Sequence, residues 1–142
     1  MEIKECMFSE VEPFLEDLFS QQHQEHFLTN IEESEEQISF GSWEKEQLIG
    51  GIVGKRHYQT LHVSLLGVQP AYRNTGTGSR LLKTMEEYAF THGVDTITLT
   101  TKKYQALDFY LKNGYRIFGE LENVPMKGTI KYYLVKRRNE WN

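Results

Sequence analysis

The sequence predicts a single α/β domain built on a mixed sheet, and three observations carry that prediction. The chain has 142 residues, of which 39% are hydrophobic and 13% aromatic, enough to bury one substantial core. Its hydrophobic period changes from helical to alternating near residue 38. A glycine-rich loop and a helix then separate two β-rich segments, residues 61–68 and 94–101. A right-handed crossover of this kind makes the two strands parallel.

The N-terminal part of the chain predicts a short strand followed by helices. Residues 1–8 read as the strand, so Cys6 is expected to be a buried small hydrophobe. Ser9 and Glu12 have the spacing of a capping box, and apolar residues recur after them at helical intervals. Residues 21–29 predict a second, shorter helix or an ordered loop.

Three strands are predicted next, over residues 38–43, 48–58 and 61–68, and their short connections imply antiparallel neighbours. Gly50, Gly51 and Gly54 suggest a bulge in the middle strand, or a close approach by another backbone or a ligand. The later elements are a helix from near Ser79 to Gly93, a strand over 94–101, a helix over 104–113, and strands over 115–119 and 129–136. Lys136, Arg137 and Arg138 read as a terminal basic tail.

Composition and charge narrow the classes of function. A net charge of −4 offers no general attraction for nucleic acid. A single cysteine cannot form an intrachain disulfide, and neither a leader pattern nor a long apolar run is evident, so we expect a cytoplasmic protein without a membrane anchor. His23 and His26 could share a helix face beside Glu25, but no further cluster completes a metal site, so we expect no metal.

The loop from Arg73 to Ser79, with the sequence RNTGTGS, is the most informative segment. Its glycines and small residues allow backbone N–H groups to converge at the start of the next helix, where the helix dipole favours a phosphate. Arg73 adds a guanidinium that can bind the same anion. The loop lacks the closing Gly-Lys-Ser/Thr of a P-loop and the three glycines of a dinucleotide fingerprint. An ordinary tight connection between strand and helix is the alternative.

Two segments resemble the GNAT superfamily of N-acetyltransferases. Arg73-x-x-Gly76-x-Gly78 after a strand is similar to its acetyl-CoA-binding motif. Ala106-x-x-Phe109-Tyr110, ending in Gly114-Tyr115, is similar to a later helix of the family. The resemblance covers essentially the whole chain and implies the GNAT fold. That fold is a mixed, mostly antiparallel sheet with splayed parallel strands 4 and 5 and about four flanking helices, in one domain over residues 1–142.

The resemblance also implies roles for individual residues. Unpaired backbone at Leu66, Gly67 and Val68 would hold the pantetheine arm of the cofactor, with Gly67 in a bulge. Further cofactor contacts would come from Arg73, Asn74, Thr75, Gly76, Thr77, Gly78, Ser79, Gln105, Phe109 and Tyr110. Tyr110 would also protonate the leaving thiolate, which a neutral phenol can do. A core tyrosine whose hydroxyl binds backbone is the alternative reading of Tyr110.

The general base is the weakest part of the resemblance. Many family members place a carboxylate on the strand before the glycine loop, whereas this chain has Ser64 four residues before Val68. His62 shares a face with Ser64 under simple alternation and has a suitable intrinsic pKa, so it is the candidate base or water relay. A packed, hydrogen-bonded histidine is the alternative, and Glu122 is a second candidate base.

We therefore expect an acetyl-CoA-dependent N-acetyltransferase. Acetyl would pass to a primary amine by direct attack in a ternary complex, and the acceptor would be a small molecule or a peptide. No metal, nucleic acid or membrane is expected to take part, and the aromatic final strand (Tyr132, Tyr133) permits a homodimer. The alternative is a non-catalytic acyl-CoA-binding or sensor module on the same fold, which the missing strand carboxylate motivates.

Overall fold

The computed structural model describes residues 1–26 and 35–141 of the chain. It consists of two compact units, Met1–Glu33 and Ser34–Asn142, and each is described by itself. The larger unit holds the sheet and both segments that resemble the GNAT family.

The smaller unit contains a single helix, α1 (Phe8–His26), with Pro13 inside it. The predicted first strand is wrong, because residues 1–7 form no strand, and Cys6 is exposed rather than buried. The predicted capping box of Ser9 and Glu12 is also wrong. The contact at the start of α1 is instead a hydrogen bond from the backbone N–H of Met7 to Glu10 Oε1, at 3.3 Å. Instead of a second helix after residue 20, α1 continues to His26, and residues 27–29 lie outside the described part.

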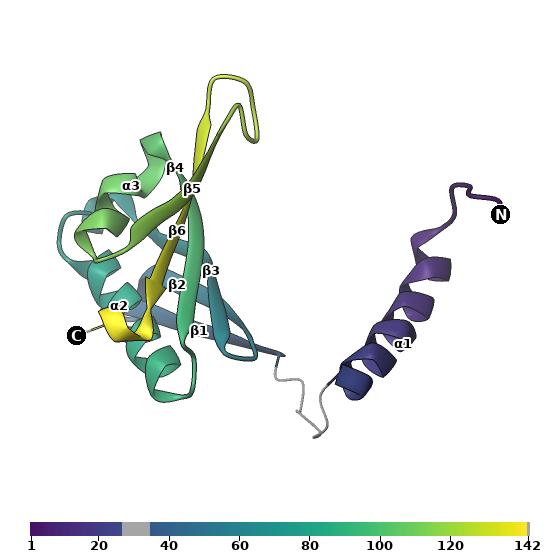
Figure 1. The fold of residues 1–142 in the computed structure, drawn as a ribbon. Helices are drawn as coiled ribbons and strands as arrows, with labels where there is room; N and C mark the ends of the chain where they lie inside the picture. Colours follow the sequence, from purple (N-terminus) through teal and green to yellow (C-terminus); the bar gives the residue numbers. More distant parts are fainter. Residues whose placement is uncertain (27–34, 142) are drawn as a thin grey trace. The chain divides into compact units, whose positions relative to one another are not determined.

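The larger unit is built on a six-stranded sheet with the order β1-β2-β3-β4-β6-β5 (Figure 1). The strands are β1 (Glu35–Glu44), β2 (Gln47–His57), β3 (Thr60–Val68), β4 (Thr96–Lys102), β5 (Arg116–Glu122) and β6 (Ile130–Arg137). Among these strands, β3 and β4 pair in parallel and the other neighbours pair antiparallel. The predicted mixed sheet is therefore confirmed. The predicted parallel strands 4 and 5 are β3 and β4, because the expected first strand does not form.

Two helices connect the strands, α2 (Thr77–Thr91) between β3 and β4, and α3 (Lys103–Lys112) between β4 and β5. With α1 this gives three α-helices in the described part of the chain rather than about four. Short 3₁₀ turns occur at Pro70–Tyr72 and Arg138–Glu140. None of the helices within residues 1–26 and 35–141 has the length and apolarity needed to cross a membrane.

Both α2 and α3 pack against one face of the sheet, which we call the covered face (Figure 1). Alternation along the strands directs every second residue into this core. Its fully buried large residues include Leu61, Leu82, Met85, Phe90, Ile97 and Leu134. Burying each such side chain contributes about 1.5–3 kcal/mol, so this layer supplies much of the stability of the unit. The opposite, or open, face carries large apolar side chains that stay exposed, among them Trp43, Leu48 and Leu65.

A buried ion pair joins the covered face to α2. Lys136 Nζ lies 3.1 Å from Glu86 Oε1 and donates to the carbonyl of Asn113 at 3.0 Å, and the two side chains are 10% and 2% exposed. The prediction that Lys136 belongs to a terminal basic tail is wrong, because Lys136 lies within β6 and is buried. Tyr132, Leu134 and Lys136 alternate into the core along β6, so the position of Lys136 in the strand decides its environment.

Candidate functional site

The parallel strands β3 and β4 stay together over a short stretch and then separate. Their pairing comprises three rungs, the last of which joins His62 to Thr98. The remainder of β3, from Val63 to Val68, has no β4 partner along that edge. The predicted splay is thus present, and we call this opening the fork. Strand N–H and C=O groups that face the fork can pair with an extended amide ligand as an added strand would.

Leu66 and Val68 direct their backbone groups toward the fork. The N–H of Gln69 donates across to β2, to the carbonyl of Ile49 at 2.8 Å. Because alternate residues of a strand point to the same side, Gly67 also turns toward β2, where it pairs with Gly51. Leu66 and Val68 therefore face the other way, and the Val68 carbonyl accepts a hydrogen bond from Arg73 Nε at 3.2 Å. Gly67 therefore offers no free N–H group to a ligand in the fork. It leaves space there instead, because it has no side chain.

The bulge in β3 lies at Ser64 rather than at Gly67, so the predicted bulge position is wrong. Val53 pairs with Leu65 while the next residue of β2, Gly54, pairs with Val63, which leaves Ser64 as the extra residue. Its hydroxyl donates to the Val53 carbonyl at 3.2 Å, and this bond stabilises the irregularity. This extra residue interrupts the simple alternation on which the shared face of His62 and Ser64 rests, and that shared face stays a prediction.

The glycine loop ends where α2 begins. Asn74 and Gly76 adopt positive φ angles of 63° and 86°, and Gly76 is the N-cap residue of α2. A Cβ atom added to Gly76 would meet nothing within 4 Å, so conformation rather than space favours glycine at this position. The first helical bond runs from the N–H of Arg80 to the Gly76 carbonyl at 3.0 Å. The N–H groups of Thr77, Gly78 and Ser79 thus have no partner within the helix and can bind an anion.

Side chains within the loop hold it in shape. The Thr75 hydroxyl donates to the Tyr72 carbonyl and lies 2.9 Å from the Thr77 hydroxyl. Arg73 ties the loop to the end of β3 through its Nε. Within the described residues its two Nη nitrogens remain available for a phosphate, and the predicted phosphate contact of Arg73 stays a prediction.

Gly78 allows three elements to meet. A Cβ atom at this position would lie 3.3 Å from the Phe109 ring of α3 and 3.8 Å from Val68 Cγ2 of β3. The second glycine of the motif is therefore favoured by close packing, whereas the first is favoured by its φ angle. The contact brings the start of α2, the open end of β3 and α3 to one point. All three segments singled out in the sequence meet at the fork.

Tyr110 lies beside Phe109 in the same cluster. It is 7% exposed, and its ring contacts the rings of Phe109 and Tyr115 edge-on, with centroid separations of 5.2 and 5.9 Å. Burial raises the pKa of the Tyr110 phenol, which keeps it protonated at neutral pH. In the described residues its hydroxyl makes no hydrogen bond to backbone, so the alternative that assigned it such a bond gains no support.

Helix α3 is interrupted at Ala106, where φ and ψ are −157° and 23°. The prediction that Ala106, Phe109 and Tyr110 lie on one continuous helical face is therefore wrong in detail, although all three pack against the core. The side chain of Gln105 lies outside the described residues, and its predicted cofactor contact stays a prediction.

His62 lies on the open face, away from Tyr110, at the last rung before the fork. Its Nδ1 is 3.0 Å from Thr98 Oγ1, a partner that sequence reasoning did not identify. Partial burial, and then the positive charges of Lys131 and Lys55, lower the pKa of His62 below its usual value. The imidazole is thus neutral near pH 7 and can accept a proton. Glu122, the other candidate base, is exposed at the end of β5.

Metal ligands do not gather in the described residues, where no group of three or more His, Cys, Asp or Glu side chains could hold an ion. The side chain of His26 lies outside the described part. The arrangement that can act on a ligand is the fork together with the first turn of α2. A strand edge with free amide groups beside a helix N-terminus that can bind an anion is suited to an extended ligand carrying amides and phosphates.

Comparisons with known proteins identify the family. Residues 4–115 match the family described as acetyltransferase (GNAT) family, so the chain belongs to this family. It is 35% identical over 99 residues to Blasticidin-S acetyltransferase from Streptomyces morookaense, a match that covers 69% of this chain and 72% of that protein.

Solved structures agree with that assignment. The fold is similar to an acetyltransferase from Bacillus cereus ATCC 14579, with a TM-score of 0.83, 29% identity and coverage of 96% and 97% of the two chains. It is also similar to an aminoglycoside 6′-N-acetyltransferase complexed with coenzyme A, with a TM-score of 0.67, 20% identity and coverage of 84% and 79%.

Proposed function

We propose that this acetyltransferase moves an acetyl group from acetyl-CoA to a primary amine on a small molecule or peptide, by direct attack in a ternary complex. The observation that carries the proposal is the meeting of Val68, Gly78 and Phe109 at the fork. This contact supports the proposal because free strand amides and a helix N-terminus that can bind an anion lie close together there. The relatives support the choice of ligand and acceptor, because one is a complex with coenzyme A and the named acceptors of two are blasticidin S and aminoglycosides.

The cofactor would lie along the fork. Leu66 and Val68 would pair with the amides of its pantetheine arm, and Gly67 would leave room beside them. The N–H groups of Thr77, Gly78 and Ser79, with the guanidinium of Arg73, would bind the pyrophosphate. The remaining loop residues, Asn74, Thr75 and Gly76, would shape this cradle, and Gln105 and Phe109 would contact the cofactor from α3.

Chemistry would begin with attack of the neutral amine on the thioester carbonyl. Strand N–H groups near Val68 would polarise that carbonyl, and the site would hold amine and thioester together. Tyr110 would then donate its proton to the departing thiolate, which its raised pKa permits because the phenol is protonated at neutral pH.

His62 would accept the proton that the amine loses. It lies four residues before Leu66, about 13 Å along a strand, so a water chain would carry the proton to it. Its lowered pKa leaves the imidazole neutral and able to accept.

The proposal takes residues 1–142 as a single cytoplasmic domain. A homodimer that extends the sheet would pair through β1 or β5, the edge strands, because β6 already has partners on both sides.

A screen for acetyl-CoA consumption across polyamines, aminoglycosides, nucleoside antibiotics, amino acids and peptides tests the proposal. Release of free thiol with at least one amine, together with a product 42 Da heavier by mass spectrometry, is the expected result. Tight acetyl-CoA binding without thiol release for any amine would instead support a non-catalytic acyl-CoA sensor.

A further inference from the structure

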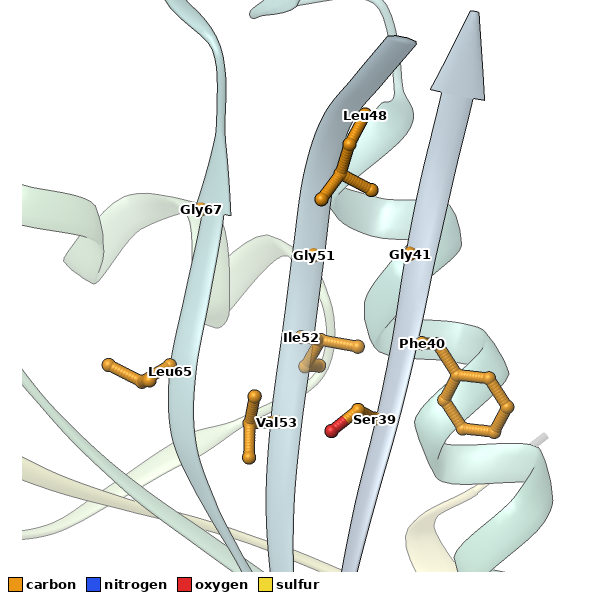
Figure 2. A pocket seen from close by; sticks show the side chains of 9 residues that line it. All are labelled: Ser39, Phe40, Gly41, Leu48, Gly51, Ile52, Val53, Leu65 and Gly67. Carbon is orange, nitrogen blue, oxygen red and sulfur yellow. The ribbon is translucent and has the colours of Figure 1, made fainter. Parts of the chain in front are cut away.

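Three glycines lie in register on neighbouring strands of the open face. Gly41 of β1 pairs with Gly51 of β2, and Gly51 pairs with Gly67 of β3. Together they form a row without side chains that is about 10 Å wide, given a strand spacing of about 4.8 Å. Figure 2 shows the row as a bare stretch of three strands between flanking side chains. A cavity of about 460 Å³ lies over it, which we call the glycine trough.

Packing explains other glycines of β2 but not Gly51. A Cβ atom at Gly50 or Gly54 would be 3.3 Å from Leu81 or 3.1 Å from Met85, so these two glycines make room for α2 on the covered face. A Cβ atom at Gly51 would point to the open face and meet the Phe40 carbonyl at 3.6 Å, an ordinary contact. At Gly67 it would meet nothing within 4 Å. Within the described residues of the larger unit, no side chain fills the space above these two residues.

One end of the trough is closed and the other reaches the fork. A Cβ atom at Gly41 would lie 2.7 Å from the Trp43 indole and 2.9 Å from Leu48, so these two side chains cover the β1 end. The far end is Gly67, between the fork-facing residues Leu66 and Val68. A ligand in the trough would therefore reach the place where the proposed function puts the thioester.

The lining of the trough selects an uncharged occupant. Ser39, Val53 and Leu65 form one wall, and Leu48 stands opposite (Figure 2). Among the described residues that line it, none carries a charge, and the Ser39 hydroxyl is the polar side-chain group. The volume is within the range of small-molecule sites, about 300–1,000 Å³. A flat ring can contact bare peptide planes over its whole surface, whereas a thicker body would be held away by the walls.

We propose that the glycine trough is the acceptor subsite and takes a flat, uncharged ring carried by the primary amine, with the amine at the Gly67 end. This inference rests on the proposed function and adds a substrate class to it. Gly51 is then a specificity-determining residue, because any side chain there fills the floor on which the ring lies.

The test compares two amines of equal size on a variant that should fold. Gly51→Val adds a β-branched residue that suits a strand, at a position with ordinary contacts. Gly119→Val is the matched control, since a Cβ atom on that β5 glycine meets Tyr133 at 3.9 Å, far from the trough in strand order. Benzylamine supplies a flat ring and cyclohexylmethylamine a puckered one, while ethylamine has no ring.

We expect the native protein to prefer benzylamine to cyclohexylmethylamine by about 10-fold in kcat/KM. Gly51→Val should lower kcat/KM for benzylamine by at least about 10-fold, mainly through KM, as expected when added methyl groups fill a pocket. Ethylamine turnover and acetyl-CoA affinity should change less than about twofold, and Gly119→Val should behave as the native protein. Equal effects of Gly51→Val on all three amines would overturn the proposal, while the acetyltransferase assignment would stand.

A binding measurement keeps the proposal testable if none of these amines is acetylated. The chain has two tryptophans, so Trp141→Phe leaves Trp43, which closes the trough, as the sole indole. Benzylamine should change Trp43 fluorescence, and Gly51→Val should raise the midpoint concentration about 10-fold in that background. A midpoint that Gly51→Val leaves unchanged, or no response of Trp43, would overturn the trough as a ring site. Absence of turnover with an intact Trp43 response would count against the proposed function alone.

Discussion

On the face covered by α2 and α3, side chains fill the space between helices and sheet, whereas the same strands leave backbone and large apolar groups exposed on the opposite face. Leu61 and Met85 of the covered face are fully buried, while Leu65 of the open face is 68% exposed. Strand β3 contributes to both, with Val63 in the core and Gly67 in the glycine trough. The contrast indicates that stability comes from the covered face, whereas ligand contacts are proposed at the open face and the fork.

The largest effect should come from the ion pair of the covered face. Glu86→Ala leaves Lys136 charged and nearly buried without its partner, which should lower the free energy of unfolding by about 3–5 kcal/mol. Leu65→Ala on the open face should change it by less than about 1 kcal/mol. Urea denaturation measures both.

A double variant tests the reason for that loss. Glu86→Leu with Lys136→Met replaces the pair by apolar side chains, so it should recover much of the stability that Glu86→Ala loses. If Glu86→Ala and Leu65→Ala lower the free energy of unfolding by equally small amounts, the claim that stability comes mainly from the covered face is wrong.

Acetyl-CoA binding should respond next most strongly, at the fork. Gly76→Glu introduces a carboxylate where the phosphates would bind, and it strains the backbone because Gly76 has a positive φ. Calorimetry should show the affinity for acetyl-CoA weakened at least about 100-fold. Gly128→Glu is the matched control, because Gly128 also has a positive φ of 90° and open space around it, in the loop before β6. Equal affinities of both variants for acetyl-CoA would show that the glycine loop before α2 does not bind the cofactor.

Loss of one phenol should slow the chemistry without affecting binding. Tyr110→Phe should reduce kcat by about 100-fold, the lower end of the range for general acid catalysis, and leave acetyl-CoA affinity within about twofold. Tyr132→Phe removes a hydroxyl from another buried tyrosine of the same cluster and should leave kcat nearly unchanged. Turnover reduced equally in both variants would indicate a packing effect instead of proton donation.

The smallest predicted effect is a pH dependence that arises on the open face. Because the pKa of His62 is lowered in the folded state, the unfolded chain binds the proton more tightly. His62 should therefore cost stability as pH falls below about 6.5, the ordinary pKa of histidine. Urea midpoints at pH 7.5 and 5.5 should differ more for the native protein than for His62→Asn. A His62 titration midpoint above 6.5 by NMR would contradict this.

Sequence patterns predicted the elements that depend on local spacing. Arg73, Gly76 and Gly78 lie where the motif places them, because a strand, a tight loop and a helix N-terminus are set by neighbouring residues. The larger unit also shows the predicted order of strands and helices, since each segment carries its own period.

Features that depend on distant partners were not predictable in this way. The extra residue at Ser64 is stabilised by a carbonyl of β2, and Lys136 is buried because Glu86 of α2 meets it. Residues 1–8 have the pattern of a strand but pair with no strand in the described part of the chain. The row formed by Gly41, Gly51 and Gly67 could not be predicted, because it depends on the register of three strands. The sequence indicated only that Gly51 is an uncommon residue within a strand.

Amide hydrogen exchange with and without acetyl-CoA tests the central claim most directly. If the cofactor pairs with the fork and its pyrophosphate caps α2, exchange should slow at Leu66, Val68, Thr77, Gly78 and Ser79. Amides that face β1 from β2, such as those of Ile52 and Gly54, should be unaffected. Unchanged exchange at the fork and at the start of α2, under conditions where calorimetry shows binding, would contradict the account.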